Sequence, residues 1–305
     1  MRRRGTGTVG AVAGERWERA DGLAAAVGAA LDDEVVALVP VHGGDVAEAF
    51  RVELAGGRTV FAKTHPNPPP EFFVTEATGL TWLREAGAVA VPEVLAVLDD
   101  PPALVLEWID EGRPGPTTET ALGRALAALH RAGAPSFGRE DRRTTGSRGL
   151  PNEPFPTWAE AYAENRLRPL ARLARVGRAL PPDACLDLEL VADRLTELGG
   201  PAEPPARLHG DLWAGNRLVG AGGENWLIDP AAHGGHREFD LAMMRLFGGF
   251  SADCFGTYAD AFPLADGWEA RVPLHQLAPL AVHAIKFGGA YVGATRRALD
   301  AVLDG

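Results

Sequence analysis

This 305-residue chain is poor in several features, and each scarcity excludes a class of protein. Its two cysteines, Cys185 and Cys254, are too few for a disulfide framework or a cysteine zinc cluster, which indicates a reducing, cytoplasmic setting. No run of about 18 apolar residues occurs, so we expect no membrane-spanning helix. The net charge of −11 disfavours nucleic acid as a partner. A phosphate-bearing small ligand is still compatible with this charge, because its site needs only local positive charge.

The apolar pattern changes in character after Ile109. Before that residue, short β-like runs surround one helical stretch; after it, a linker rich in Gly and Pro at residues 110–116 leads into mostly helical sequence. This order resembles the two-lobed arrangement of protein kinases. We therefore predict an α+β, bilobal, protein-kinase-like fold. Residues 1–109 would form a small nucleotide-binding lobe with an antiparallel sheet and one main helix. Residues 110–305 would form a larger, mostly helical lobe for catalysis and substrate binding, with a nucleotide cleft between the lobes.

Individual elements follow from periodicity and from turn residues. The paired glycines Gly56 and Gly57 predict a hairpin turn between two strands. The predicted strands cover residues 35–41, 47–54, 59–64, 94–98 and 103–107. The predicted helices cover residues 16–31, 71–85, 118–131, 157–176 and 183–198, and helices recur from residue 238 to the end.

The most informative motif is the run HGDLWAGN at residues 209–216, followed by an apolar strand that ends at Asp229. Phosphoryl transfer needs a base near the attacking hydroxyl and ligands for magnesium. Asp211 is the candidate catalytic base, and Asn216 and Asp229 are candidate Mg²⁺ ligands, because Mg²⁺ prefers hard oxygen donors. Asp211 and Asn216 would also be explained by an Asx-type turn. The second aspartate, placed directly after a strand, favours the metal site.

Two residues upstream fit the other half of such a site. Lys63 lies on the third predicted strand, and Glu76 lies on the helix that follows. In kinases a pair of this kind holds the lysine against the nucleotide phosphates. A solvated lysine at a strand edge and an unrelated glutamate form the alternative. Together with the downstream motif, the pair favours ATP binding.

Weaker signals come from the first loop and from the junction of the predicted lobes. Gly43 and Gly44 lie where a loop would cover the phosphates, but a plain hairpin turn explains them equally well and the pattern GxGxxG is absent. Asp45 in the same loop is unexpected, because its carboxylate would repel a triphosphate. The stretch Glu107, Trp108 and Ile109 would offer backbone groups to the adenine edge, unless it is a simple linker.

At this point the motifs resemble a known family. The run at 209–216, with Trp213 after HGDL, resembles the catalytic loop of the fructosamine kinase (ketosamine-3-kinase) family within the aminoglycoside phosphotransferase-like group. Further similar runs make the resemblance extend over about residues 14–303. They are EATGL at 76–80, LVLE at 104–107, GHREFDLAM at 235–243, LFGGF at 246–250 and FGGAY at 287–291.

The resemblance implies an ATP- and Mg²⁺-dependent kinase that phosphorylates the 3-hydroxyl of a sugar joined to an amine as a ketoamine. The 3-phosphate is unstable and sheds the sugar, so the reaction repairs glycation of free or protein-bound amines. Trp213 would stack beside the substrate, with core packing as the alternative. His236, Glu238 and Asp240 would contact the substrate amine or brace the catalytic loop.

Other functions stay open at this point. A kinase for aminoglycosides, choline or similar amines is the nearest alternative, and a nucleotide-binding pseudokinase is another. A protein kinase is disfavoured, because residues 229–238 leave no room for a long activation segment. Members of the family with cysteine in place of Asp45 are linked to redox-controlled dimers, so we expect a monomer. The sequence does not rank fructosamine, ribulosamine and erythrulosamine substrates.

Overall fold

The computed structural model describes residues 22–41, 47–141, 144–145 and 149–304. As far as these residues go, the chain forms two compact units. One comprises Met1–Ala77 and Pro92–Ile109, and the other comprises Thr78–Val91 and Asp110–Gly305. A border between the units falls after Ile109, and the two lobes expected at residues 1–109 and 110–305 stay a prediction. The segment Thr78–Val91 differs, since it packs with the second unit rather than with the sheet.

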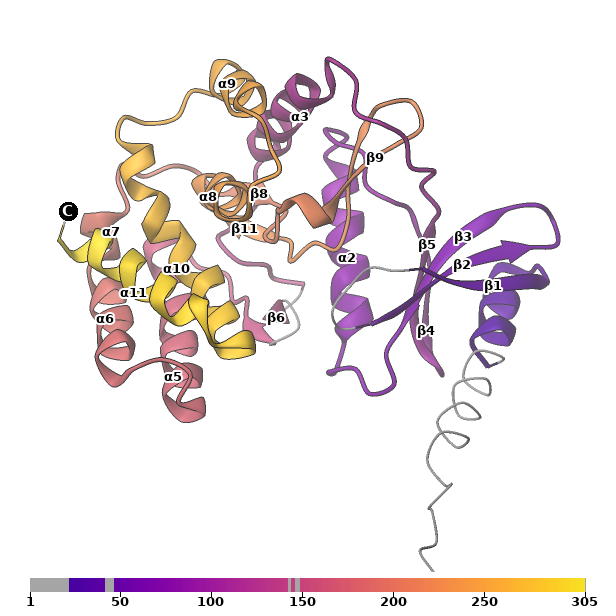
Figure 1. The fold of residues 1–305 in the computed structure, drawn as a ribbon, viewed down its shortest axis with the longest axis horizontal. Helices are drawn as coiled ribbons and strands as arrows, with labels where there is room; N and C mark the ends of the chain where they lie inside the picture. Colours follow the sequence, from indigo (N-terminus) through magenta and orange to yellow (C-terminus); the bar gives the residue numbers. More distant parts are fainter. Residues whose placement is uncertain (1–21, 42–46, 142–143, 146–148, 305) are drawn as a thin grey trace, which may run out of the picture. The chain divides into compact units, whose positions relative to one another are not determined.

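An antiparallel sheet forms the body of the first unit (Figure 1). Its order is β1-β2-β3-β5-β4, so consecutive strands pair as hairpins except where β5 is inserted next to β3. The bounds are Val35–Val41 for β1, Glu48–Leu54 for β2, Thr59–Thr64 for β3, Val94–Asp99 for β4 and Pro102–Glu107 for β5. The predicted sheet is confirmed, including the hairpin turn at Gly57, where the amide of Leu54 donates to the carbonyl of Arg58 at 2.9 Å.

A small core supports this sheet on one face. Residues 22–31 are helical, and Leu23 and Val27, one turn apart, are fully buried against the sheet. Alternate residues along the strands, such as Val52 and Leu54 on β2, complete the cluster. Lys63 on β3 is therefore held on a rigid strand rather than on a loop.

Helix α2, Phe72–Glu85, belongs to both units. Its first part, which includes Glu76, lies in the first unit, and its remainder lies in the second. There the Arg84 guanidinium donates to the carbonyl of Val91 at 2.7 Å. The predicted helix at 71–85 is thus found with nearly the same ends.

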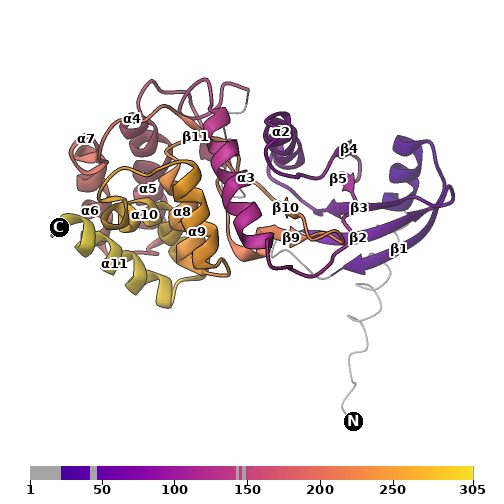
Figure 2. The same cartoon turned by 90° about the horizontal axis from the view of Figure 1, so that it is seen from above.

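The second unit is a helical assembly around one large apolar core (Figures 1 and 2). In Figure 2, α3 and α9 lie side by side, and α10 packs against both α8 and α11. The helices are α3 (Thr118–Ala132), α4 (Trp158–Tyr162), α5 (Arg168–Gly177), α6 (Pro182–Asp193), α7 (Leu195–Leu198), α8 (Glu238–Phe247), α9 (Ala252–Ala261), α10 (Trp268–Phe287) and α11 (Ala290–Leu303). None of the helices in the described ranges combines the length and apolar character needed to cross a bilayer.

Two predicted helices differ from the structure in their continuity. The stretch predicted at 157–176 is divided into α4, a π-helical turn η1 at Ala163–Leu167, and α5. The stretch predicted at 183–198 is divided at Arg194 into α6 and α7. Apolar periodicity marks a buried helical face but does not report such local changes in winding.

Two short antiparallel strand pairs in the second unit flank the loop at residues 209–216. β8 (Ala206–Leu208) pairs with β11 (His233–Gly235), and β9 (Arg217–Val219) pairs with β10 (Asn225–Leu227). Residues 209–216 connect β8 to β9, and residues 228–232 connect β10 to β11. Because both strand pairs are fixed, the two connecting loops are held together. One more antiparallel pair, β6 (Thr144–Thr145) with β7 (Leu150–Pro151), comes earlier in the chain, between α3 and α4.

Candidate active site

The two loops approach so closely at Gly210 that only glycine fits there. Gly210 has a φ of +81°, and a Cβ atom at this position would lie 2.1 Å from the carbonyl oxygen of Ala231. A residue with a side chain would therefore have both a strained backbone and a steric clash. The glycine of the HGD motif brings the loop that carries Asp211 against the loop that carries Asp229.

The structure brings the predicted residues Asp211, Asn216 and Asp229 together. The amide nitrogen of Asn216 donates to the backbone carbonyl of Asp211 at 2.8 Å and to its carboxylate Oδ2 at 3.1 Å. It also lies 3.5 Å from the carbonyl oxygen of Asp229. Asp229 has a φ of +52°, an uncommon conformation for a residue with a side chain. Such backbone strain is a frequent property of functional sites.

Burial makes Asp211 a better base than an ordinary aspartate. Burial raises its pKa to about 6, the hydrogen bond from Asn216 opposes this, and the negative charges of Asp229 and Asp240 add to it. The positive charge of Lys286 lowers the pKa again. A carboxylate with a pKa near 6 is largely ionised at neutral pH and still accepts a proton readily, as a general base must.

The donor atoms beside Asp211 fit a magnesium ion. Since the amide nitrogen of Asn216 is directed at Asp211, its carbonyl oxygen is turned the other way. That oxygen and the carboxylate of Asp229 are both hard donors, which Mg²⁺ prefers over nitrogen or sulfur ligands. The residues present therefore match the predicted metal and argue against a soft transition metal.

Asp240 supports the catalytic loop from within the protein. Its side chain is fully buried and accepts hydrogen bonds from the amides of His209 (2.8 Å) and Gly210 (2.9 Å). His130 on α3 lies 3.2 Å from the same carboxylate and is itself hydrogen-bonded to Tyr258 at 2.8 Å. Burial raises the pKa of Asp240, but the His130 hydrogen bond and the neighbouring charges more than offset it. This geometry is that of a brace, and a substrate contact for Asp240 stays a prediction.

His209 joins the same network through its ring. Its Nε2 donates to the carbonyl of Ile228 at 2.9 Å, and its Nδ1 accepts from the amide of Asp211 at 3.3 Å. Burial lowers the pKa of this histidine, so the ring is neutral and fits both partners. The residue thus ties the strand before Asp229 to the backbone of Asp211.

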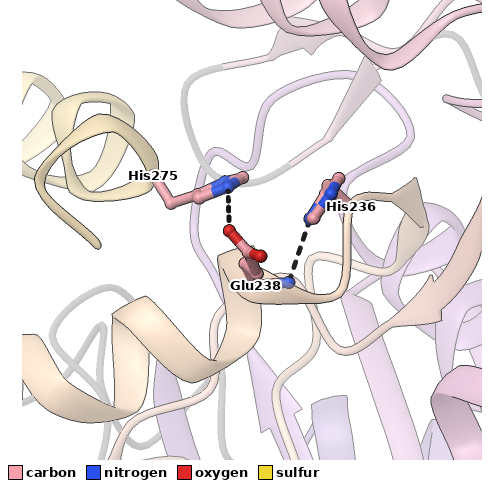
Figure 3. A group of neighbouring side chains, drawn as sticks. All are labelled: His236, Glu238 and His275. Atoms are coloured by element: carbon pink, nitrogen blue, oxygen red, sulfur yellow. Dashed lines mark hydrogen bonds and ion pairs between the residues drawn. The ribbon is translucent and has the colours of Figure 1, made fainter. Parts of the chain in front are cut away.

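His236 and Glu238, two more predicted substrate residues, lie in a separate buried cluster with His275 (Figure 3). The carboxylate of Glu238 accepts two hydrogen bonds from Arg271, at 2.6 and 3.0 Å, and lies 3.3 Å from Nε2 of His275. Its amide donates to Nδ1 of His236 at 3.3 Å. Trp158 packs on both imidazoles, with ring centroids 5.4 and 5.0 Å away.

The atoms of this cluster are close enough together for a metal ion, but their present bonds favour a structural role. The possible ligand atoms of His236, Glu238 and His275 lie within 4.8 Å of one another. Arg271 already occupies both carboxylate oxygens, and a divalent ion would meet this fixed positive charge. Burial raises the pKa of Glu238, yet His275 and Arg271 bring it to about 2. We interpret the cluster as a buried ion-pair network, and substrate contacts of its members stay predictions.

Trp213 lies on the surface of the second unit. It is 42% exposed, and its ring lies across the backbone of Gly215, where a Cβ atom would be 2.2 Å from the indole. Its ring is also 6.3 Å from that of Phe247. An exposed, fixed indole two residues from Asp211 is available to a ligand, whereas its predicted stacking on substrate remains to be tested.

In the first unit, Lys63 and Glu76 form the predicted pair. Their side chains make an ion pair of 2.5 Å, and Lys63 is only 7% exposed. A lysine this well buried needs a partner, and a glutamate on α2 fixes the direction of its ammonium group. The contact therefore matches the one expected of a lysine that holds nucleotide phosphates.

The structure says less about the other residues that were predicted to bind ATP. Gly43, Gly44 and Asp45 lie outside the described residues. Glu107, at the end of β5, accepts a hydrogen bond from the amide of Glu93 at 3.0 Å. Trp108 is partly buried under the guanidinium of Arg51, 5.6 Å from the ring centroid, and Ile109 follows it. These contacts fix the strand end and leave its predicted role toward adenine untested.

Comparisons with known proteins settle the family. The sequence profile described as Fructosamine kinase matches residues 21–305. The chain belongs to the fructosamine kinase family. A protein of Thermus thermophilus named as a ketoamine kinase is 38% identical over 291 residues, covering 92% of this chain and 99% of its own length. A second, of Enterococcus faecium and named likewise, is 34% identical over 255 residues, covering 83% and 91%.

Solved structures agree with this membership. One named as a fructosamine-3-kinase, from Thermobifida fusca, is 42% identical with a TM-score of 0.86, covering 93% of this chain and 99% of that one. An aminoglycoside phosphotransferase at 14% identity and a TM-score of 0.61 shares the fold alone. The predicted family and the predicted fold are both confirmed.

Several residues that support the candidate active site could not be identified from the sequence of this fructosamine kinase family member. His130 and Tyr258 support Asp240, Arg271 neutralises Glu238, and Lys286 acts on Asp211. Each is a single polar residue on a helix far along the chain from its partner, so no motif or spacing identifies it.

Proposed function

We propose that the protein is an ATP-dependent kinase that phosphorylates the 3-hydroxyl of ketosamines, the fructosamine, ribulosamine or erythrulosamine adducts of amines, and thereby leads to deglycation. The observation that carries this proposal is Asp211. It is a partly buried carboxylate with a pKa near 6, hydrogen-bonded to Asn216, in a chain of the fructosamine kinase family. Membership supplies the substrate class, and Asp211 supplies the chemistry that the substrate requires.

In the proposed reaction, Asp211 accepts the proton of the 3-hydroxyl while the hydroxyl oxygen attacks the γ-phosphorus of ATP. The new O–P bond forms as the bond from the γ-phosphorus to the bridging oxygen breaks, and ADP leaves. Asn216 and Asp229 would hold Mg²⁺, which neutralises charge on the phosphates when bound. Lys63, directed by Glu76, would bind the phosphates as a point charge.

The acceptor would lie on the exposed indole of Trp213. An aromatic face suits both the apolar face of a sugar and the protonated amine next to it. Backbone groups at Glu107–Ile109 would meet the adenine edge, and Gly43 and Gly44 would cover the phosphates. We further propose a monomeric, cytoplasmic enzyme whose acceptors are free or protein-bound ketoamines.

Comparison of acceptors tests the proposal. ADP release would be measured with ribulosyl-lysine and fructosyl-lysine beside kanamycin and choline, and ³¹P NMR would locate the phosphate on the product. We expect turnover with the ketoamines and a phosphate on O3. Turnover confined to kanamycin or choline would overturn the proposal in favour of another small-molecule kinase. Asp211→Asn serves as the control, since it should abolish turnover while nucleotide binding survives.

A further inference from the structure

A small cavity lies inside the second unit, next to the π-helical turn η1. Its volume is about 20 Å³. A cavity larger than about 10–15 Å³ holds one particle of the size of water. Residues of η1 form one wall, and β11 forms another, with Leu208 of β8 beside it. None of the described residues that line the cavity is an aspartate or a glutamate, so its lining is neutral or positively charged.

The positive charge at the cavity belongs to Arg166, which is only 6% exposed. Its guanidinium donates to the carbonyls of Pro151 at 2.6 Å and Asn165 at 3.0 Å, and to Oδ1 of Asn152 at 3.3 Å. All three acceptors are neutral. Burial lowers the pKa of Arg166 to about 10, so the group stays charged at neutral pH. A buried charge without a partner of opposite sign is strongly destabilising.

No carboxylate in the described part of the chain pairs with Arg166. The two buried carboxylates of α8 are bound elsewhere. Glu238 accepts two hydrogen bonds from Arg271, and Asp240 accepts from the backbone amides of the catalytic loop. Neither of them supplies a negative charge to the guanidinium of Arg166.

The amide group of Asn152 is a second sign of a missing ligand. Asn152 lines the cavity and is 1% exposed. Its Oδ1 accepts from Arg166, and this bond fixes the orientation of the amide, because the opposite orientation would place two donors against each other. Its Nδ2 is buried and has no hydrogen-bond partner among the described residues. A buried donor without an acceptor destabilises a fold, so an acceptor in the cavity would remove this cost.

The π-helical turn η1 holds these groups together. Four of its five residues are buried, among them Asn165 and Arg166. Asn165 makes two hydrogen bonds with the backbone of Glu153, at 2.8 and 3.2 Å, and so joins η1 to the segment that carries Asn152. Single π-helical turns are rare and are frequent at functional sites. The winding of this segment therefore agrees with a binding site at the cavity.

We propose that the cavity binds one small monovalent anion, of the size of chloride, between the guanidinium of Arg166 and Nδ2 of Asn152. The anion supplies both the counter-charge for Arg166 and the acceptor for Asn152. A water molecule would fill the same volume but would leave the charge uncompensated. Phosphate and sulfate, with five heavy atoms each, are too large for this cavity. Bound there, the ion joins η1 to β11, whose partner β8 leads into the catalytic loop. The inference does not depend on the proposed function.

Thermal unfolding of the full chain in chloride and in gluconate tests the proposal. Sodium gluconate replaces sodium chloride at constant ionic strength, so the screening of charges is the same and only the small anion varies. An ion that binds only the folded state stabilises it. We therefore expect the Tm to rise by about 2 °C when chloride reaches ten times its Kd, and to depend on the logarithm of its concentration. An equal Tm in both salts would overturn the proposal.

Bromide locates the site directly, because it resembles chloride and scatters X-rays anomalously. Crystals in bromide should show an anomalous peak inside the cavity, in contact with Nδ2 of Asn152 and the guanidinium of Arg166. A water molecule at this place, with no bromide, would refute the assignment of an anion.

Asn152→Asp supplies the missing charge from the protein itself, since aspartate has the shape of asparagine. This variant should have the same Tm in chloride and in gluconate, and the bromide peak should be lost. Asn225→Asp is the matched control, because Asn225 is also buried and accepts from Arg217 at 2.8 Å but does not line the cavity. Whatever its own Tm, its gain in chloride should equal that of wild type. A wild-type response in Asn152→Asp, or a response lost in Asn225→Asp as well, would contradict a site in the cavity.

Discussion

The environment of Asp211 opposes its charged form, and this should make the wild-type protein less stable than a variant with a neutral residue there. Its pKa rises from 3.8 to about 6, with burial as the main cause. One pKa unit corresponds to about 1.4 kcal/mol, so ionised Asp211 costs the folded state about 3 kcal/mol relative to the unfolded chain. This is an upper value, because Asp211 keeps some contact with solvent.

The sign of the effect depends on pH. Well below pH 3.8 the carboxyl is protonated in both the folded and unfolded states, and the cost vanishes, so that only a small part of it remains at pH 4. As pH rises through the folded pKa of about 6, the cost reaches its full value and then stays constant. Asparagine is neutral at every pH and keeps an oxygen for the hydrogen bond from Asn216. Asp211→Asn should therefore abolish turnover and raise the free energy of unfolding at pH 8, with little change near pH 4.

Urea unfolding followed by tryptophan fluorescence, at pH 4 and at pH 8, measures this difference. We expect a gain of up to about 3 kcal/mol at pH 8 that fades as the pH is lowered. An Asp211→Asn protein that is no more stable than wild type at pH 8 would refute the reasoning. A gain of equal size at both pH values would refute it as well, since the gain would then not come from ionisation.

Three further substitutions test other parts of the site. Asp240→Asn should have the opposite effect to Asp211→Asn. Because the pKa of Asp240 is lowered, its ionised carboxylate stabilises the fold at neutral pH, and this stabilisation is lost as pH falls. The variant should therefore lose about 2 kcal/mol of unfolding free energy at pH 8 in the same urea assay. Gly210→Ala should lower the free energy of unfolding by at least about 2 kcal/mol, because of its φ and the clash at Ala231, and thermal unfolding should show a reduced Tm. Glu76→Gln should raise the KM for ATP, measured by ADP release, by about tenfold, while the KM for the ketoamine stays the same.

The catalytic loop was predictable because its parts are close together in the sequence. Asp211 and Asn216 share one loop, and Asp229 follows after a short hairpin, so their spacing alone implies that they meet. Lys63 and Glu76 were predictable from a strand followed by a helix, an order that the structure reproduces. In both cases local chain geometry brings the residues together, and sequence reports local geometry well.

The long-range supports of the site were not predictable in the same way. His130 meets Asp240, and Lys286 acts on Asp211, across long stretches of chain that carry no shared motif. A lone histidine or lysine on a helix leaves no periodic signal, and its partner is set by how helices pack. Glu238 shows the same limit: the run GHREFDLAM marks the residue, whereas only packing shows that it meets Arg271 and His275.

The scarcity of lysine has a practical consequence for chemical labelling. Reagents that acylate or reductively alkylate amines need an accessible side-chain ammonium group, and this chain offers two. Lys63 is 7% exposed and ion-paired, which should slow its modification in the folded state. Lys286, in the last turn of α10, is more accessible. Among the side chains, an amine-directed fluorophore should therefore attach mainly at Lys286, without any engineered cysteine.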